Sequence, residues 1–393
     1  MRVLITGVDG YLGWPLAQHL TRAGHEVAGI DDYSRRRWVG EMGSQSAIPI
    51  VPMADRLVAF REETGKSLRF YKGDLCDRSF VTNTLKSFKP ESIVYLGEMP
   101  SAPYSMIDAE HAVYTQTNNV MGTLETLFAM RDIVPDCHLV KLGTMGEYGT
   151  PNVDIPEGHF ELEYRGRKDR VMFPRKAGSW YHQSKVHDTN NVDMACRIWG
   201  LRSTDIMQGV VYGTRWDEMG ADPRLATRFD FDQCFGTAIN RFCCQAVIGL
   251  PMTPFGKGSQ KRGFLPLRDS MACLTIAVEN PAEAGEYRTF NQFEEVYNVN
   301  ELAEKIQKVG KTLGLNPEIR NIANPRFEEE VHHYNPDHQA LLDLGYKPTH
   351  DMEGEIAAML EDLIANKDRI ASREDAVFPD IRWDGSRSRS EYL

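Results

Sequence analysis

The chain lacks a long apolar segment and an excess of positive charge. No apolar run approaches the ~20 residues that cross a bilayer, so we expect no membrane-spanning helix. Aspartate and glutamate number 56 against 45 lysines and arginines, which gives a formal net charge of −11. Nucleic-acid-binding proteins usually carry the opposite sign. The composition therefore argues against a membrane protein and against a nucleic-acid-binding protein.

Cysteine is scarce and scattered. Its seven copies in 393 residues form no C-x-x-C pair and no cluster with histidine, and such spacings are what metal and redox sites need. We interpret the cysteines as reduced thiols, most of them in the core, and we predict no metal site. An apolar segment follows Met1 directly and leaves no room for a signal peptide. We therefore expect a cytoplasmic protein.

The first half of the chain alternates strand-like and helical segments. The expected strands cover residues 2–6, 26–30, 68–71, 92–96, 138–142 and 202–207, and two long helices cover residues 113–130 and 181–199. This alternation predicts an α/β fold, namely a Rossmann-type, doubly wound parallel sheet with helices on both faces. Further helices are expected at residues 300–313 and 351–365.

We divide the chain into three parts. Residues 1–212 form the predicted dinucleotide-binding domain, with a partly helical flap inserted at residues 32–67. Residues 213–378, where Pro, Gly and Arg are frequent, form a smaller mixed α/β substrate-binding lid, with some return of the chain to the core. Residues 379–393 form a tail that we expect to be flexible.

Three glycines with the spacing G-x-x-G-x-x-G follow the first strand and open a helix. In this context glycine allows a tight turn and lets a pyrophosphate approach the free N–H groups at the helix N-terminus. The spacing favours the short-chain dehydrogenase type of turn. We expect this turn to bind a nicotinamide dinucleotide through Gly7, Asp9, Gly10, Tyr11, Leu12 and Gly13.

Two acids, Asp31 and Asp32, end the second predicted strand. A carboxylate there accepts hydrogen bonds from a ribose diol and repels a 2′-phosphate, which favours NAD over NADP. Arg35 and Arg36 argue the other way, because guanidinium groups hold phosphates. They could instead be solvated flap charges or contact the NAD pyrophosphate, and we predict NAD. The remaining predicted cofactor residues are Asp74 (alternatively a helix N-cap), Leu75, Asn119 and Val211.

Tyr181 and Lys185 are spaced i, i+4 in a predicted helix, so they lie on one face of it. An ammonium beside a phenol lowers the pKa of the phenol, which would let Tyr181 act as a base toward a sugar hydroxyl near neutral pH. Lys185 would also hold the nicotinamide ribose. Thr144 ends the fifth strand, where ligands bind in open α/β sheets. A Tyr–Lys pair alone is often a surface pair, but here it follows the glycine turn, the acid and Thr144 in order.

The whole order resembles that of extended short-chain dehydrogenases, which bind NAD permanently and act on nucleotide sugars; epimerases, 4,6-dehydratases and decarboxylases share it. The stretches at residues 101–108, 142–152, 208–213 and 235–242 are similar, more narrowly, to the UDP-sulfoquinovose synthase family. The resemblance runs from about residue 1 to residue 350.

The resemblance implies an enzyme that forms a carbon–sulfur bond, of the hydrolase-type class for such bonds, from UDP-glucose and sulfite. NAD would oxidise C4, water would leave across C5 and C6, sulfite would add at C6, and C4 would be reduced again. Sulfite would arrive free or from a sulfite-donating partner protein. The helices at 113–130 and 181–199 resemble those that pair in family homodimers.

Met145 and Gly146 follow Thr144, where sugar 4,6-dehydratases typically carry Asp and Glu. Ordinary dehydratase chemistry is therefore not expected. We assign proton handling at C5 and C6 to Glu147 and His182, with hydrogen-bonded support of the site as their alternative role. Met145 is expected to shape the pocket.

Arg262 and Arg326 match arginines that the family uses on the substrate diphosphate, which suits guanidinium geometry. Pro100 stands where the plant enzymes carry an arginine, so the residues that bind sulfite stay unassigned. The alternatives to this reading are a UDP-hexose 4-epimerase and, more remotely, a non-catalytic NAD-binding regulatory protein. Gln208 is expected at the diphosphate or sugar, and Thr237, Ala238, Asn240, Thr253 and Phe255 around the uridine.

Overall fold

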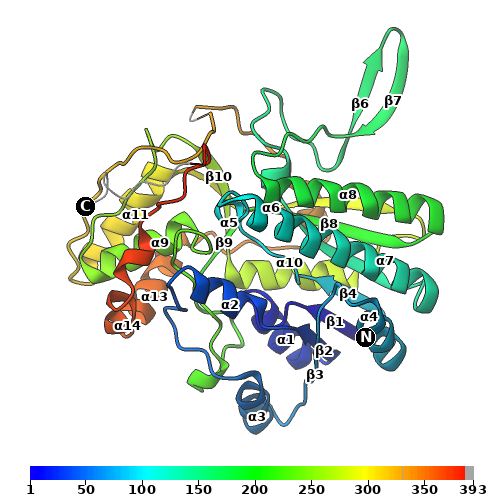
Figure 1. The fold of residues 1–393 in the computed structure, drawn as a ribbon, viewed down its shortest axis with the longest axis horizontal. Helices are drawn as coiled ribbons and strands as arrows, with labels where there is room; N and C mark the ends of the chain where they lie inside the picture. Colours follow the sequence, from blue (N-terminus) through cyan, green and yellow to red (C-terminus); the bar gives the residue numbers. More distant parts are fainter. Residues whose placement is uncertain (330, 386–393) are drawn as a thin grey trace.

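A seven-stranded parallel sheet forms the centre of the protein, as Figure 1 shows for the computed structural model, which describes residues 1–329 and 331–385. The strand order is β11-β8-β5-β4-β1-β2-β3, and every neighbouring pair is parallel. This confirms the predicted α/β class. The strands are β1 (Arg2–Thr6), β2 (Glu26–Asp31), β3 (Arg69–Lys72), β4 (Ser92–Tyr95), β5 (His138–Thr144), β8 (Arg202–Gln208) and β11 (Tyr287–Gln292).

Helices cover both faces of this sheet. Val3 and Ile5 of β1 point to the face covered by α1 (Gly13–Arg22) and α10 (Leu267–Glu279). Leu4, between them, points to the other face, covered by α4 (Arg78–Phe88), α7 (Gly122–Ile133) and α8 (Trp180–Trp199). Successive side chains of a strand alternate between faces, so a strand buried on both sides carries an apolar run, as Val3, Leu4 and Ile5 do in β1.

One predicted helix is more complex than expected. Residues 113–130 span the end of α6 (Ala109–Gln116), a π-helical turn η1 (Thr117–Met121) and most of α7. Such turns insert one extra residue in a helix and occur frequently at functional sites. Here the turn buries Asn119, whose side chain binds the Met99 backbone and Ser184 Oγ.

The C-terminal part builds a second core. A three-stranded sheet joins β9 (Val210–Tyr212), β10 (Lys261–Pro266) and β12 (Glu295–Asn298). Helices α9 (Ala238–Ile248), α11 (Val299–Thr312) and α13 (Met352–Ile364) pack together beside it through Phe242, Ile306 and Leu360. Between these elements the chain returns to the central sheet as β11. The domain boundaries themselves stay predictions.

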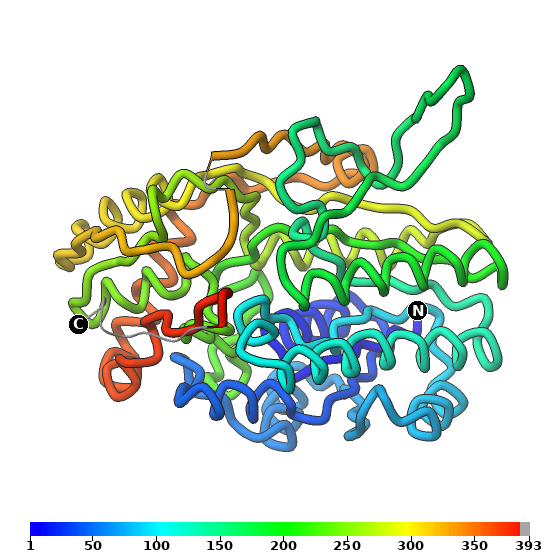
Figure 2. The backbone as a smooth tube through the Cα atoms, turned by 45° about the horizontal axis from the view of Figure 1, so that its top comes forward, coloured from blue at the N-terminus to red at the C-terminus, as the bar shows by residue number. Residues whose placement is uncertain are grey.

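Two insertions leave the layered body. The flap contains α2 (Ser34–Glu41) and α3 (Met53–Thr64). The hairpin of β6 (His159–Tyr164) and β7 (Arg167–Met172), which we did not predict, projects from the body in Figures 1 and 2. The remaining short elements are α5 (Ala102–Ser105), η2 (Met145–Glu147), η3 (Pro223–Leu225), α12 (Gln339–Asp343), α14 (Lys367–Ala371) and η4 (Glu374–Val377).

Part of the segment that we expected to be a flexible tail packs against the body. Ile381 is buried against Trp38 and Phe235, and the N–H of Trp383 donates to Pro325 O at 3.0 Å. Apolar contact at Ile381 and the hydrogen bond of Trp383 therefore hold this part of the segment, while residues 386–393 lie outside the described residues. Within the described ranges no helix is long and apolar enough to span a membrane.

Candidate active site

A cavity of about 720 Å³ lies at the carboxyl ends of the central strands, between the sheet and the C-terminal part. This is where open α/β sheets bind ligands, because loops diverge there and helix N-termini point inward. Its walls come from the glycine turn, from the segments that follow β2, β4 and β5, from the start of α8, and from α9 and β10. Among the described residues, no group of three or more His, Cys, Asp or Glu side chains could hold a metal ion.

The glycine turn forms a side-chain-free end of the cavity. Gly7 has φ +70°, and a Cβ there would lie 2.6 Å from Leu96 O. A Cβ on Gly13 would collide with the Gly7 backbone. Only glycine leaves this surface open for a pyrophosphate to reach the backbone N–H groups. The turn residues that line the cavity are Gly7, Gly10, Tyr11, Leu12 and Gly13.

Asp9 and Arg36 do not face the cavity, contrary to our expectation. Asp9 is 1% exposed and lies beneath the turn, where it accepts hydrogen bonds from Arg36 at 2.6 Å and from buried Arg56 at 3.0 Å. A buried carboxylate requires such partners. The ion pairs of Asp9 with Arg36 and Arg56 therefore stabilise the glycine turn, and Arg36 is not available to a phosphate.

The predicted acids do line the cavity. Asp31 accepts backbone hydrogen bonds from Asp9 and Tyr33 at 2.8 and 2.7 Å, and burial raises its pKa to about 6. Arg35 also lines the cavity, but it is paired with Asp230 at 2.8 Å and stacked on Phe235. The other predicted cofactor residues that line the cavity are Asp32, Asp74, Leu75 and Val211.

Asn119, like Asp9 and Arg36, is a predicted cofactor residue that does not line the cavity. Its amide holds the backbone of Met99 and the start of α8, one layer behind the cavity. The side-chain-free turn and the acid that ends β2 still fit a dinucleotide with an unphosphorylated adenosine ribose.

Thr144, Tyr181 and Lys185 meet in the cavity, as the sequence predicts. The Ser179 side chain caps α8 and starts the helix just before Tyr181. Lys185 Nζ lies 5.9 Å from the centre of the Tyr181 ring and donates to Leu142 O at 2.6 Å. Burial, reinforced by Glu98 and Glu147, raises the pKa of Tyr181 above its ordinary value. The cations that lower this pKa are Lys141 and Arg35 rather than the expected Lys185, and burial outweighs them.

Glu98 lines the cavity and was not predicted. It lies just beyond β4, is 5% exposed and forms an ion pair with Lys185. An acid placed just after a central strand is the signal that could have found it, but nothing local in the sequence connects it to Lys185.

His182 lines the cavity beside Gly146, next to Tyr181 on α8. A Cβ on Gly146 would lie 2.5 Å from His182 Cδ2 and closer still to Nε2, so glycine is required there. Ser179 Oγ contacts His182 Nδ1 at 3.0 Å. Burial and the nearby Arg326, Arg262 and Lys185 lower the pKa of His182 to about 3, so the ring is neutral.

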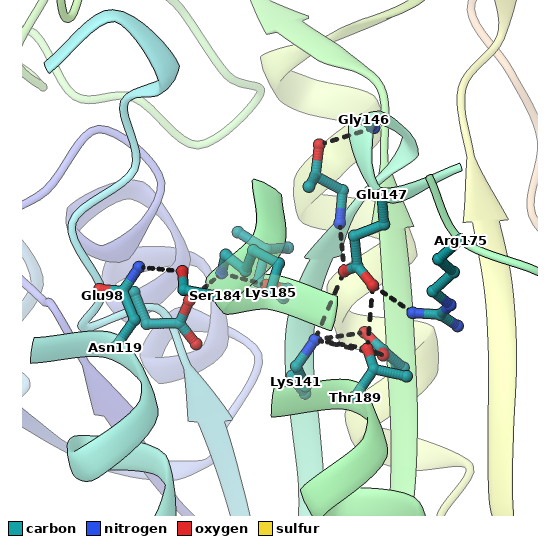
Figure 3. A network of polar contacts seen from close by, with 12 residues as sticks. Glu98, Asn119, Lys141, Gly146, Glu147, Arg175, Ser184, Lys185 and Thr189 are labelled. Carbon is teal, nitrogen blue, oxygen red and sulfur yellow. Dashed lines mark hydrogen bonds and ion pairs between the residues drawn. The ribbon is translucent and has the colours of Figure 1, made fainter. Parts of the chain in front are cut away.

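Glu147 points away from the cavity, which corrects the proton-transfer role expected for it. It is fully buried and bonds to Arg175, to Thr189 Oγ1 at 3.1 Å and to the backbone N–H of Thr144 at 3.4 Å. Figure 3 shows Glu147 with Arg175 and Thr189. Glu147 therefore holds Thr144 from behind, which is the supporting role that we considered as its alternative.

The C-terminal part supplies the other wall. Arg262 pairs with Glu328 at 2.8 Å, and Arg326 lies over the rings of Phe255 and Trp383. The predicted substrate residues that line the cavity are Met145, Gln208, Thr237, Asn240, Arg262 and Arg326.

Ala238, Thr253 and Phe255 are not among the lining residues. Thr253 is buried and bonds to Gln245, and the Phe255 ring supports Arg326 and Arg241 from below. Trp383, from the segment expected to be flexible, lines the cavity instead.

Residues 3–292 match the model of the NAD dependent epimerase/dehydratase family. The chain therefore belongs to that family. Within it, the chain is 46% identical over 382 residues to the chloroplastic UDP-sulfoquinovose synthase of Spinacia oleracea, covering 97% of the chain and 79% of the relative. It is also 46% identical over 384 residues to the UDP-sulfoquinovose synthase of Sulfolobus acidocaldarius, covering 98% of both chains.

More distant relatives carry other activities. A UDP-glucose 4-epimerase of Mycolicibacterium smegmatis is 29% identical over 288 residues, or 73% of this chain and 75% of that one. The solved structure of a UDP-glucose 4-epimerase from Thermotoga maritima superposes with a TM-score of 0.67 at 18% identity, covering 92% of this chain and 98% of that one. At this identity the similarity shows a shared fold.

Proposed function

We propose that the protein is an NAD-dependent UDP-sulfoquinovose synthase, which makes UDP-sulfoquinovose from UDP-glucose and sulfite. The observation that carries this proposal is the 46% identity, over nearly the whole chain, to enzymes of that name from a plant and an archaeon. The Thr144–Tyr181–Lys185 group in the cavity supports it, because the reaction needs reversible oxidation of a sugar hydroxyl.

The first step takes the proton from the hydroxyl at C4. Tyr181 is the base for this proton, and Thr144 shares a hydrogen bond with the same oxygen. The chemistry that bound NAD supplies is acceptance of the C4 hydride and its return in the last step. Lys185 orients the nicotinamide ribose, and the cations Lys141 and Arg35 favour the phenolate form of Tyr181 against burial.

The middle steps remove the proton at C5, expel the hydroxyl at C6 and add sulfite there. A ketone at C4 acidifies the C5 proton, and a protonated Tyr181 strengthens this effect by donating a hydrogen bond to the ketone oxygen. His182 is the cavity residue suited to proton transfer, because its neutral ring can accept the proton from C5 and the resulting imidazolium can then give that proton to the hydroxyl that leaves C6. Met145 and Gly146 leave room for the sugar where dehydratases carry acids.

The diphosphate of the substrate binds to Arg262 and Arg326, whose guanidinium groups match phosphate oxygens. Thr237 and Asn240 contact the nucleoside, and Gln208, held by Gln292 at 3.0 Å, contacts the sugar or diphosphate. Pro100 lines the cavity. No cation comes from this position, so sulfite is bound by other groups or delivered by a partner protein.

We also propose a homodimer, through one face of the helical layer. This face presents apolar side chains to solvent from α6, η1 and α8, which pack side by side. Isolated exposed apolar residues are ordinary, whereas a row of them marks an interface. A monomer in size-exclusion chromatography with light scattering would refute the dimer. The residues are Val113, Met121, Trp180, Met194 and Ile198.

The test of the function is the mass of the product. Purified protein is incubated with UDP-glucose and sulfite, without added NAD, and analysed by mass spectrometry. A sulfonated UDP-hexose supports both the reaction and a retained cofactor. Unchanged mass together with UDP-galactose in chromatography would instead establish a UDP-hexose 4-epimerase, which needs the same Thr144, Tyr181 and Lys185.

A further inference from the structure

Glu98 is a cavity acid to which the steps above give no role. Its side chain is 2% exposed, and it forms an ion pair with Lys185 Nζ (Figure 3). The same Nζ donates to Leu142 O at 2.6 Å. An ammonium has three N–H donors. The Leu142 carbonyl accepts from one of them, and Glu98 holds the ammonium by the attraction of opposite charges, so N–H groups of Lys185 are left for a ligand in the cavity.

We propose that Glu98 is a positioning residue of the Tyr181–Lys185 pair: its ion pair with Lys185 and the hydrogen bond to the Leu142 carbonyl together fix the Lys185 ammonium, so that a further N–H reaches a hydroxyl of the bound cofactor. This proposal rests on the proposed function, because it takes Tyr181 and Lys185 as the catalytic pair. A lysine side chain has four rotatable bonds, and a single hydrogen bond would not fix its direction.

The Glu98 carboxylate also changes the charge around Tyr181. Lys141 and Arg35 lower the pKa of Tyr181, whereas burial, Glu98 and Glu147 raise it. A phenol that keeps its proton can donate a hydrogen bond to the C4 ketone while water leaves and sulfite adds. Glu98 therefore favours the protonated state of Tyr181 that the middle steps require.

Asp188 lies one turn after Lys185 on α8 and is fully buried. Its carboxyl oxygens have no hydrogen-bond partner among the described residues. The buried cations Lys141, Arg175 and Lys185 face the buried anions Glu98, Glu147 and Asp205. Three positive and three negative charges balance, so a further buried charge would be uncompensated.

Asp188 is accordingly the neutral member of this network. Burial and the neighbouring Glu98 raise its pKa well above the usual range. Tyr95, another titratable group that interacts with Glu98, also stays neutral, because burial raises the pKa of its phenol. Glu98 is thus the carboxylate that forms the ion pair with Lys185.

The test measures NADH absorbance after enzyme with retained NAD is mixed with UDP-glucose alone, over a range of pH. Glu98→Gln keeps an acceptor but removes the charge. We expect its rate to fall about 10-fold and the acidic limb of its pH profile to move about one unit lower. Glu98→Asp keeps the charge, so its rate should fall with no shift of the profile. Asp188→Asn mimics a neutral acid, so its profile should match that of the wild type.

Retained NAD and the thermal midpoint are measured on each variant, so that a folding defect is separated from a change in proton transfer. Wild-type rate and pH profile in Glu98→Gln would overturn the positioning role. A shifted profile in Glu98→Asp would overturn the assignment of the shift to charge, and a shift in Asp188→Asn as large as that in Glu98→Gln would overturn the neutral state of Asp188. This readout precedes sulfite addition. A wild-type enzyme that forms NADH but no sulfonated sugar would refute the proposed function alone.

Discussion

Replacing Gly146 by alanine tests how closely the cavity wall is fitted to His182. The added Cβ would lie 2.5 Å from His182 Cδ2, about 1 Å inside the ~3.5 Å of ordinary contact. Thr144 and Glu147 form a capping box that anchors the wall, so the imidazole is the group that must move. A displacement of about 1 Å from a productive position lowers a rate on the order of 10²-fold. We expect kcat for the sulfonated product to fall by about this factor.

The assay follows the sulfonated product by mass spectrometry at saturating UDP-glucose and sulfite, with bound NAD measured on the same sample. Gly146 is remote from the glycine turn, so NAD content should not change. Gly40→Ala is the control, because a Cβ there meets nothing within 4 Å and lies in a helix, where alanine is favoured. Wild-type turnover in Gly146→Ala would refute the assignment of proton transfer to His182.

Three further predictions concern the cofactor, the buried network and pH. Gly13→Ala places a Cβ against the backbone of the glycine turn, so the purified protein should lose its NAD. Bound NAD is measured by chromatography after denaturation. Full NAD content would contradict the binding of the pyrophosphate at this turn. Asp205→Asn removes a partner of buried Lys141 at 3.2 Å and should lower the free energy of unfolding in urea by about 3–5 kcal/mol. As a control, Asp193→Asn removes the partner of Arg197, a pair at 2.9 Å in which Arg197 is exposed, and should cost less than about 1 kcal/mol. Burial lowers the pKa of His138 in the folded protein to about 3, whereas histidine in an unfolded chain has a pKa of about 6.5. Above about pH 6.5 the side chain is neutral in both states and the fold keeps its full stability. That stability should be lost at about 1.4 kcal/mol per pH unit as pH falls below 6.5, and His138→Gln should reduce this slope in unfolding titrations.

Local signals predicted the catalytic chemistry. The glycine turn, the acid at the end of β2 and the Tyr181–Lys185 spacing each depend on a few neighbouring residues, and backbone geometry links that spacing to a position on a helix face. The structure brings Tyr181 and Lys185 to Thr144 because parallel strands end at the same edge of the sheet. These elements were therefore accessible to sequence reasoning, as was the fold class.

The direction in which polar residues point was not accessible in this way. Asp9 and Glu147 lie within cofactor and catalytic motifs, yet both turn away from the cavity toward buried arginines. Their partners, such as Arg56 and Arg175, are dozens of residues away. A buried carboxylate points toward a cation that lies close to it in the folded chain. The spacing of residues in the sequence does not show which cation that is.

The sequence by itself determined the strand and helix periodicity, the open glycine turn and the Tyr–Lys pair, because each follows from local backbone geometry. Only the tertiary structure decided that Glu98 meets Lys185, that Trp383 lines the cavity and that Glu147 supports Thr144 from behind. These contacts depend on burial and long-range pairing. Burying a charge costs free energy unless an opposite charge or a hydrogen-bonding group lies beside it, and that neighbour is in place only once the chain has folded.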